Sequence, residues 1–159
     1  MRITVLCVGK VKEKFYRDAL AEFEKRLGRY CRLEILEVAD EQTPDGAGPA
    51  LEEQIREKEG ARLLSRIKEG QFVCTLEIQG KKMTSEEFAS FLEKTAMAQK
   101  GQIIFVIGGS LGLSREVRNR SDFAISFSDM TFPHQLMRVI LCEQIYRGFR
   151  ITHGEPYHK

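Results

Sequence analysis

Short apolar segments alternate with longer amphipathic ones along this chain of 159 residues, and no other feature constrains its fold as strongly. This alternation is typical of an α/β protein with a mostly parallel sheet, here of about five or six strands flanked by helices. No repeat or low-complexity tract divides the chain, so we expect a single domain over residues 1–159. The apolar segments predict strands near residues 3–8, 33–38, 72–78, 102–107 and 123–127.

The segments between the strands have helical patterns. Apolar residues recur every fourth position from Phe15 to Leu27, which predicts one buried stripe. Thr84 and Glu87 have the spacing of a capping box, so a helix should begin there. A charged helix, near 51–68, should lie on the solvated outside of the domain. The predicted helices cover about 13–27, 51–68, a stretch from Thr84, a short stretch after Ser114, and about 133–150.

The composition excludes several classes of protein. The formal net charge is only +2, so no strong overall field attracts nucleic acid, and any RNA contact must be local. The four cysteines form no Cys-x-x-Cys pair or Cys/His metal spacing, which favours buried thiols in a reducing cytoplasm and predicts no metal. The first apolar run, residues 3–8, is too short for a signal-peptide core, and nothing reaches the length of a membrane span.

A glycine-rich turn, residues 108–112, follows an apolar strand and predicts a place where a ligand approaches bare backbone. The turn lacks the Gly-x-Gly-x-x-Gly order and any Gly-Lys-Ser/Thr, which disfavours a dinucleotide fold and a phosphate-binding loop. Residues 126–134, just before a helix with Pro133 in its first turn, offer hydroxyl and backbone groups for a second wall. Each feature also has a simpler interpretation, a tight connection and a capped helix start respectively.

The last helix carries apolar side chains almost all the way round, from Leu136 to Phe149. Such a helix must be covered on every side, and one sheet covers one flank. We therefore expect a second copy of the chain on the other flank, most simply in a two-fold homodimer. Glu143, Arg147 and Arg150 form a narrow polar strip within this apolar surface, which a salt-bridged seam would also explain.

The terminal residues Tyr157, His158 and Lys159 place a phenol, an imidazole and an ammonium side by side. Chain ends are usually frayed, but Gly154 and Pro156 direct this one. An aromatic ring with basic neighbours can stack on a displaced base and hold its phosphates.

Several motifs together resemble a known family. They are 107–110, 126–135, 138–147 and 156–159, with further matches at 8–10 and 13–16. On these residues the chain closely resembles the SPOUT-class RNA methyltransferases, and within them the RlmH group, over essentially its whole length. The resemblance implies a trefoil-knotted α/β fold, which is an exception to the rule that chains avoid threading.

The same resemblance implies a function. It implies a cytoplasmic homodimer that uses S-adenosylmethionine, without a metal, to methylate N3 of a pseudouridine in a stem-loop of 23S rRNA. The near-neutral charge favours the assembled ribosome as substrate, with neither DNA nor membrane as a partner. Two other classes stay open: a nucleotide-dependent α/β protein, which the loop order disfavours, and a ribosome-associated binding protein without catalysis.

Site residues follow from the resemblance and from residue type. Two departures from the family pattern, Leu111 in the glycine loop and Gly148 in the last helix, affect the loop contacts and the dimer helix respectively. We hypothesise that His158 or Tyr157, acting from the partner's tail or with its help, eases removal of the proton from the target nitrogen, and that Arg147 stabilises the anionic base. The resemblance implies a methyl-donor pocket lined by Leu76, Gly108, Phe127, Ser128, Asp129, Met130, Thr131 and Phe132.

Overall fold

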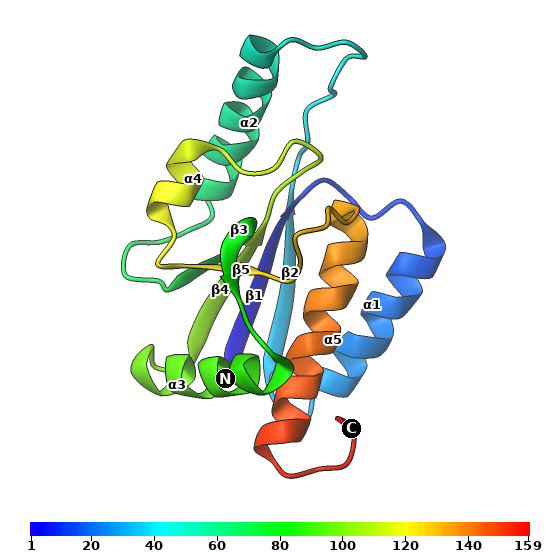
Figure 1. Cartoon of the computed structure of the whole chain (residues 1–159), viewed down its shortest axis with the longest axis vertical. Coiled ribbons are helices and arrows are strands. Elements are labelled where there is room, and N and C mark those ends of the chain that lie inside the picture. Colours follow the sequence, from blue (N-terminus) through cyan, green and yellow to red (C-terminus); the bar gives the residue numbers. More distant parts are fainter.

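The computed structural model describes all residues 1–159 and shows one five-stranded sheet, with every neighbouring pair of strands parallel (Figure 1). The strand order is β2-β1-β4-β3-β5. All five predicted strands are present. They are β1 (Arg2–Val8), β2 (Arg32–Val38), β3 (Val73–Lys82), β4 (Gln102–Ile107) and β5 (Phe123–Ser126).

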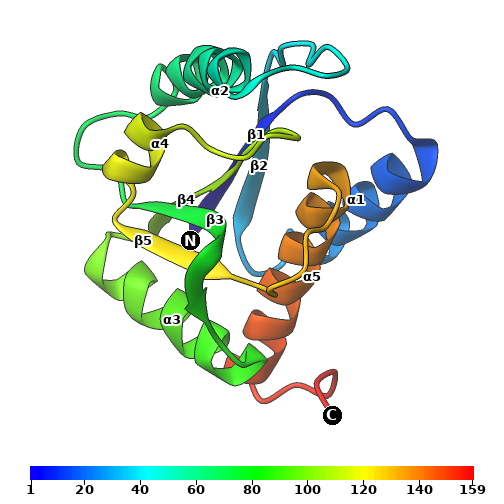
Figure 2. The ribbon, with the colours of Figure 1, turned by 45° about the horizontal axis from the view of Figure 1, so that its top comes forward.

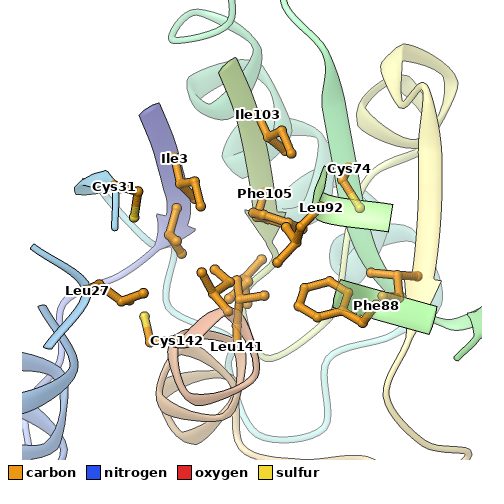
Figure 3. Packing of buried hydrophobic residues seen from close by; sticks show 14 of the residues in the cluster. Ile3, Leu27, Cys31, Cys74, Phe88, Leu92, Ile103, Phe105, Leu141 and Cys142 are labelled. Carbon is orange, nitrogen blue, oxygen red and sulfur yellow. The ribbon is translucent and has the colours of Figure 1, made fainter. Parts of the chain in front are cut away.

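Five helices cover both faces of this sheet. They are α1 (Lys14–Leu27), α2 (Pro49–Leu64), α3 (Ser85–Ala98), α4 (Arg115–Arg120) and α5 (His134–Thr152). Successive strand residues point to opposite faces, so Val5 and Cys7 of β1 pack with α1, α3 and α5, while Leu6 and Val8 pack with α2 and α4. Figure 3 shows the larger of the two cores, in which Phe88, Phe105 and Leu141 meet.

Some element boundaries differ from the prediction. Helix α2 ends at Leu64 and not near residue 68, because the backbone N–H groups of Arg66 and Ile67 bond three residues back and tighten the chain into a turn. Strand β3 runs on to Lys82, beyond the predicted end at residue 78, with a register shift against β5 between Leu76 and Lys81. Pro133 stands one position before α5, in extended conformation, and its carbonyl accepts the first helical bond.

The predicted capping box is confirmed at the start of α3. The Thr84 hydroxyl accepts from the Glu87 N–H at 3.1 Å, and the Glu87 carboxylate accepts from the Thr84 N–H at 2.8 Å. Two of the four donors that a helix start leaves unpaired are thus satisfied, and α3 begins where its sequence signal places it.

Helix α5 crosses the sheet between α1 and α3, as Figure 2 shows. These two helices and the sheet bury Leu141, Cys142 and Ile145, so the chain itself covers more of α5 than the sequence predicts. Leu136 and Ile140 stay partly exposed. A second copy over that flank remains a prediction.

All four cysteines are buried and free. Burial raises the pKa of Cys31 to about 11 and the pKa of both Cys7 and Cys142 to about 12, and it raises the pKa of Cys74 as well. The thiols therefore pack as small apolar groups, as predicted. No helix is long and apolar enough to cross a bilayer, and no group of three or more His, Cys, Asp or Glu side chains is arranged to hold a metal ion.

Candidate functional site

A pocket of about 920 Å³ opens where β4 and β5 end, beside the part of β3 that continues past its pairing with β4. Because parallel strands carry their carboxyl ends at the same edge, three segments distant in sequence meet there. Leu76 comes from β3, Gly108 follows β4, Ser126 ends β5, and residues 127–128 and 130–134 follow it. Every residue of the predicted donor pocket lines it except Asp129.

The glycine turn closes tightly on itself. The Gly112 N–H donates to the Gly109 carbonyl at 3.1 Å, and Gly112 has a φ of +83°, which favours glycine. A Cβ on Gly108 would lie 2.7 Å from the Gly112 carbonyl carbon, so a larger residue cannot fit without moving the turn. The turn therefore presents bare backbone to the pocket.

The segment after β5 forms the second wall. The Ser126 hydroxyl donates to the Ser128 carbonyl at 3.1 Å, and the Ser128 hydroxyl accepts from the Met130 N–H at 2.9 Å. Asp129 points elsewhere: its carboxylate pairs with the Lys82 ammonium at 2.5 Å and is largely exposed. The family resemblance implied that Asp129 lines the pocket with the rest of the run 127–132. In the structure its carboxylate instead lies toward Lys82 near the end of β3.

Two residues at the start of α5 support this wall. His134 lines the pocket, and burial, with the nearby Arg138 charge, lowers its pKa, so the imidazole is neutral at pH 7. Arg138 is fully buried and bonds the Glu37 carboxylate at 2.7 Å and the carbonyls of Val8 and Gly9 at 2.8 Å each. It thereby fixes α5 to the ends of β1 and β2. This role was not predicted from the sequence, although an arginine on an apolar helix face indicates a buried partner.

Helices α2 and α4 add charged groups that the sequence analysis also missed. Arg56 of α2 and Arg118 of α4 line the pocket. Glu59 of α2 is buried, and its carboxylate accepts from the Glu41 N–H at 3.1 Å. A Cβ on Gly109 would lie 3.1 Å from this carboxylate, so Glu59 buttresses the glycine turn from behind. Burial raises the pKa of Glu59.

The three predicted catalytic residues form one cluster at the other end of α5. The Arg147 guanidinium donates to the His158 Nδ1 at 3.2 Å and to the Glu143 carboxylate at 2.5 Å. The Tyr157 hydroxyl donates to the same carboxylate at 3.1 Å, and Arg147 lies over the Tyr157 ring at 4.8 Å.

The bonds of this cluster define its protonation. Because Arg147 can only donate, the His158 Nδ1 accepts, and the Nε2–H donates to the Glu86 carboxylate at 2.8 Å. A neutral imidazole with its proton on Nε2 satisfies both bonds. Burial, followed by the Glu143 charge, raises the pKa of Tyr157, so its phenol stays protonated at pH 7.

The pocket and this cluster are separate within one chain. None of Arg147, Tyr157 and His158 lines the pocket. Met137, which does, and Arg147 are ten residues apart on α5, which corresponds to about 15 Å along the axis. The structure thus brings the predicted catalytic residues to one another but not to the pocket of their own chain.

Comparison with known proteins identifies the class to which this fold and pocket belong. A family model described as "Predicted SPOUT methyltransferase" matches residues 1–158. The chain belongs to the SPOUT methyltransferase family, and the predicted SPOUT-type trefoil-knotted α/β fold is confirmed.

Curated relatives match this chain over its full length. Proteins named "Ribosomal RNA large subunit methyltransferase H" from Clostridium beijerinckii and Bifidobacterium adolescentis are each 55% identical to this chain, and one from Acetivibrio thermocellus is 51% identical, all over the full length of both chains. A solved structure described as a probable methylase family protein from Haemophilus influenzae shares the fold, with a TM-score of 0.53 at 12% identity over 99% of this chain and 70% of that one.

Proposed function

We propose that this chain is an rRNA methyltransferase that transfers a methyl group from S-adenosylmethionine to N3 of a pseudouridine in a stem-loop of 23S rRNA. One observation carries the proposal: Leu76, Gly108, residues 127–128 and residues 130–132 converge on one pocket at the carboxyl edge of the sheet, in a SPOUT-family chain. The names of its relatives support rRNA as the substrate.

The pocket suits the donor. Apolar side chains such as Leu76 and Ile107 match an adenine, while the backbone of the glycine turn and of residues 126–133 offers hydrogen bonds to a ribose. Neutral His134 adds no positive charge beside a cationic sulfonium. The volume of about 920 Å³ leaves room for part of a target nucleotide beside the donor.

S-adenosylmethionine supplies an electrophilic methyl group on a sulfonium, and transfer to N3 leaves a neutral thioether. The imide N3 attacks well only after losing its proton, so the chain must remove that proton and stabilise the anion. We assign proton acceptance to the His158 Nδ1, which becomes free when the arriving neutral base takes over the Arg147 guanidinium as a hydrogen-bond donor. The N3 proton then passes to this nitrogen, and Arg147 stabilises the anion that remains on the base. Tyr157, protonated because of its raised pKa, serves as a hydrogen-bond donor and stacking surface.

The distance between cluster and pocket supports catalysis across a homodimer. Since about 15 Å of α5 separates Met137 from Arg147, the tail of one copy serves the pocket of the other in this proposal. The partly exposed flank of α5, around Leu136 and Ile140, is the surface on which a second copy would pack. The enzyme then works in the cytoplasm on assembled ribosomes, because its small net charge gives little affinity for free RNA.

The decisive experiment is methyl transfer from labelled S-adenosylmethionine to ribosomes that lack the modification, with mass spectrometry of the 23S product. We expect one methyl on the base of one pseudouridine, and much slower transfer to a short stem-loop transcript. Binding to ribosomes without methyl incorporation would identify a non-catalytic binding protein instead. Thermal stabilisation by NAD or FMN, and not by S-adenosylmethionine, would indicate the nucleotide-dependent class.

A further inference from the structure

A polar network holds the C-terminal tail, residues 153–159, against the end of α5. The Tyr30 hydroxyl, just before β2, donates to the Glu155 carboxylate at 2.5 Å. Arg150 donates to the Tyr30 hydroxyl at 3.2 Å and ion-pairs with Glu155. We call these three residues the tail lock.

The tail lock is better built than an ordinary surface ion pair. The Tyr30 ring stacks on Phe149 with centroids 5.3 Å apart and planes at 7°. The Arg150 side chain is only 16% exposed, and its second amino group donates to the Pro156 carbonyl at 2.9 Å. Charge-assisted bonds in such a half-buried site are stronger and more directional than exposed ones.

The lock ends where the predicted catalytic residues begin. Its last contact, at Pro156, directly precedes Tyr157 and His158, and Figure 1 shows the tail turning back at that end of α5. A free chain end samples many conformations, so a group at position 158 would reach a substrate only part of the time. Fixing residues 155 and 156 removes most of this freedom while leaving the side chains of Tyr157 and His158 outside the lock.

We propose that Tyr30, Arg150 and Glu155 are positioning residues for methyl transfer, which present Tyr157 and His158 to the target base. This inference rests on the function proposed above. It assigns a catalytic consequence to a tyrosine that lies more than a hundred positions away in sequence and does not line the pocket. The tail lock acts on orientation, so its loss slows the chemical step and leaves donor binding intact.

Tyr30→Phe removes only the hydroxyl and keeps the ring on Phe149, and Glu155→Gln removes the charge. For both variants we expect kcat on saturating ribosomes to fall about tenfold. The affinity for S-adenosylhomocysteine, measured by calorimetry, and the melting temperature should stay close to those of the unmodified chain. Matched controls are Tyr16→Phe, whose hydroxyl makes no hydrogen bond, and the exposed Glu57→Gln. Both should keep full turnover.

Release of the last residues by carboxypeptidase supplies a readout that does not depend on activity. Both lock variants should lose Lys159 and His158 faster than the controls, and the double variant should lose little more kcat than either single one, because both changes break the same contact. Unchanged kcat, or a fall that tracks melting temperature and donor affinity, overturns the inference. An unmodified chain that methylates nothing would instead overturn the proposed function, and with it this role of the lock.

Discussion

The two ends of α5 are built from different chemistry. At the first end, around His134, the pocket wall is made of backbone, small hydroxyls and apolar side chains, with Arg56 and Arg118 added by α2 and α4. At the other end, Arg147, Glu143 and His158 are charged or polar groups that bond to one another at the surface. The sheet and the fully buried Arg138 fix the first end, whereas partly exposed side chains that bond to one another shape the second.

In the proposed mechanism, this difference separates donor binding at the first end from catalysis at the second. The pocket is lined by segments that the parallel sheet brings together, so we expect these segments to bind the donor. A cluster whose members satisfy one another must exchange those bonds for bonds to a substrate, so it acts only when a partner or an RNA reaches it. Changes at the first end should therefore alter stability and donor affinity, and changes at the second should alter turnover.

The largest effect should come from Arg138→Met, at the framework end. The change leaves Glu37 and two backbone carbonyls without their buried partner, so the free energy of unfolding should fall by about 3–5 kcal/mol. Urea titration measures this loss, and the control Arg66→Met, at an exposed position, should leave the free energy of unfolding almost unchanged. A loss as small as that of the control would show that α5 is not held to the sheet by this arginine.

Arg147→Ala tests the other end. We expect methyl transfer to ribosomes to slow by about 10²-fold in single-turnover measurements, because the guanidinium no longer stabilises the anionic base. Donor affinity should stay within roughly twofold of the original value, because a group that acts only in the transition state does not contribute to donor binding. If donor affinity fell as much as turnover, the separation between the two ends would be wrong. Arg66→Ala serves as the control.

Gly108→Ala should weaken the donor pocket. The added Cβ would lie 2.8 Å from the Gly112 carbonyl oxygen, so the turn must open, and we expect donor affinity by calorimetry to fall about tenfold. Gly48→Ala is the matched control, because a Cβ there meets nothing within 4 Å and its φ is −79°. Equal affinities for the two variants would contradict a ligand beside the glycine turn.

The smallest effect concerns Glu59. Because burial raises its pKa in the folded chain, the folded state holds this proton more tightly than the unfolded state, and the resulting stability is lost as pH rises above the unfolded value of about 4.5. Glu59→Gln should therefore gain stability relative to the original chain as pH rises toward 7. Urea titrations at several pH values measure this trend, and the exposed Glu57→Gln should show none.

The sequence predicted much of the fold because its local signals agree with the tertiary structure. The five strands are apolar runs bounded by turns, and the Thr84 capping box marks the start of α3 within a residue. Predictions failed where the signal was not local. The extension of β3 to Lys82 depends on pairing with β5, and the end of α2 depends on bonds within a turn.

For the site too, local sequence signals were informative, whereas features that depend on distant residues were not predicted. The family resemblance implied the pocket segments, but only the structure shows that Asp129 pairs with Lys82. Buried charges such as Arg138 and Glu59 look like surface residues in the sequence, because their partners lie on distant strands and loops. The tail lock has the same character, since Tyr30 and Glu155 are brought together only by the path of α5.

The rates at which the four buried thiols react can report how often the folded chain opens locally. Each is sealed in the core, and burial favours its protonated, unreactive form. An alkylating reagent will therefore modify the native protein only when local unfolding exposes a thiol. Because Cys7 and Cys74 lie in the sheet and Cys142 lies in α5, the order in which they react would record which layer separates first.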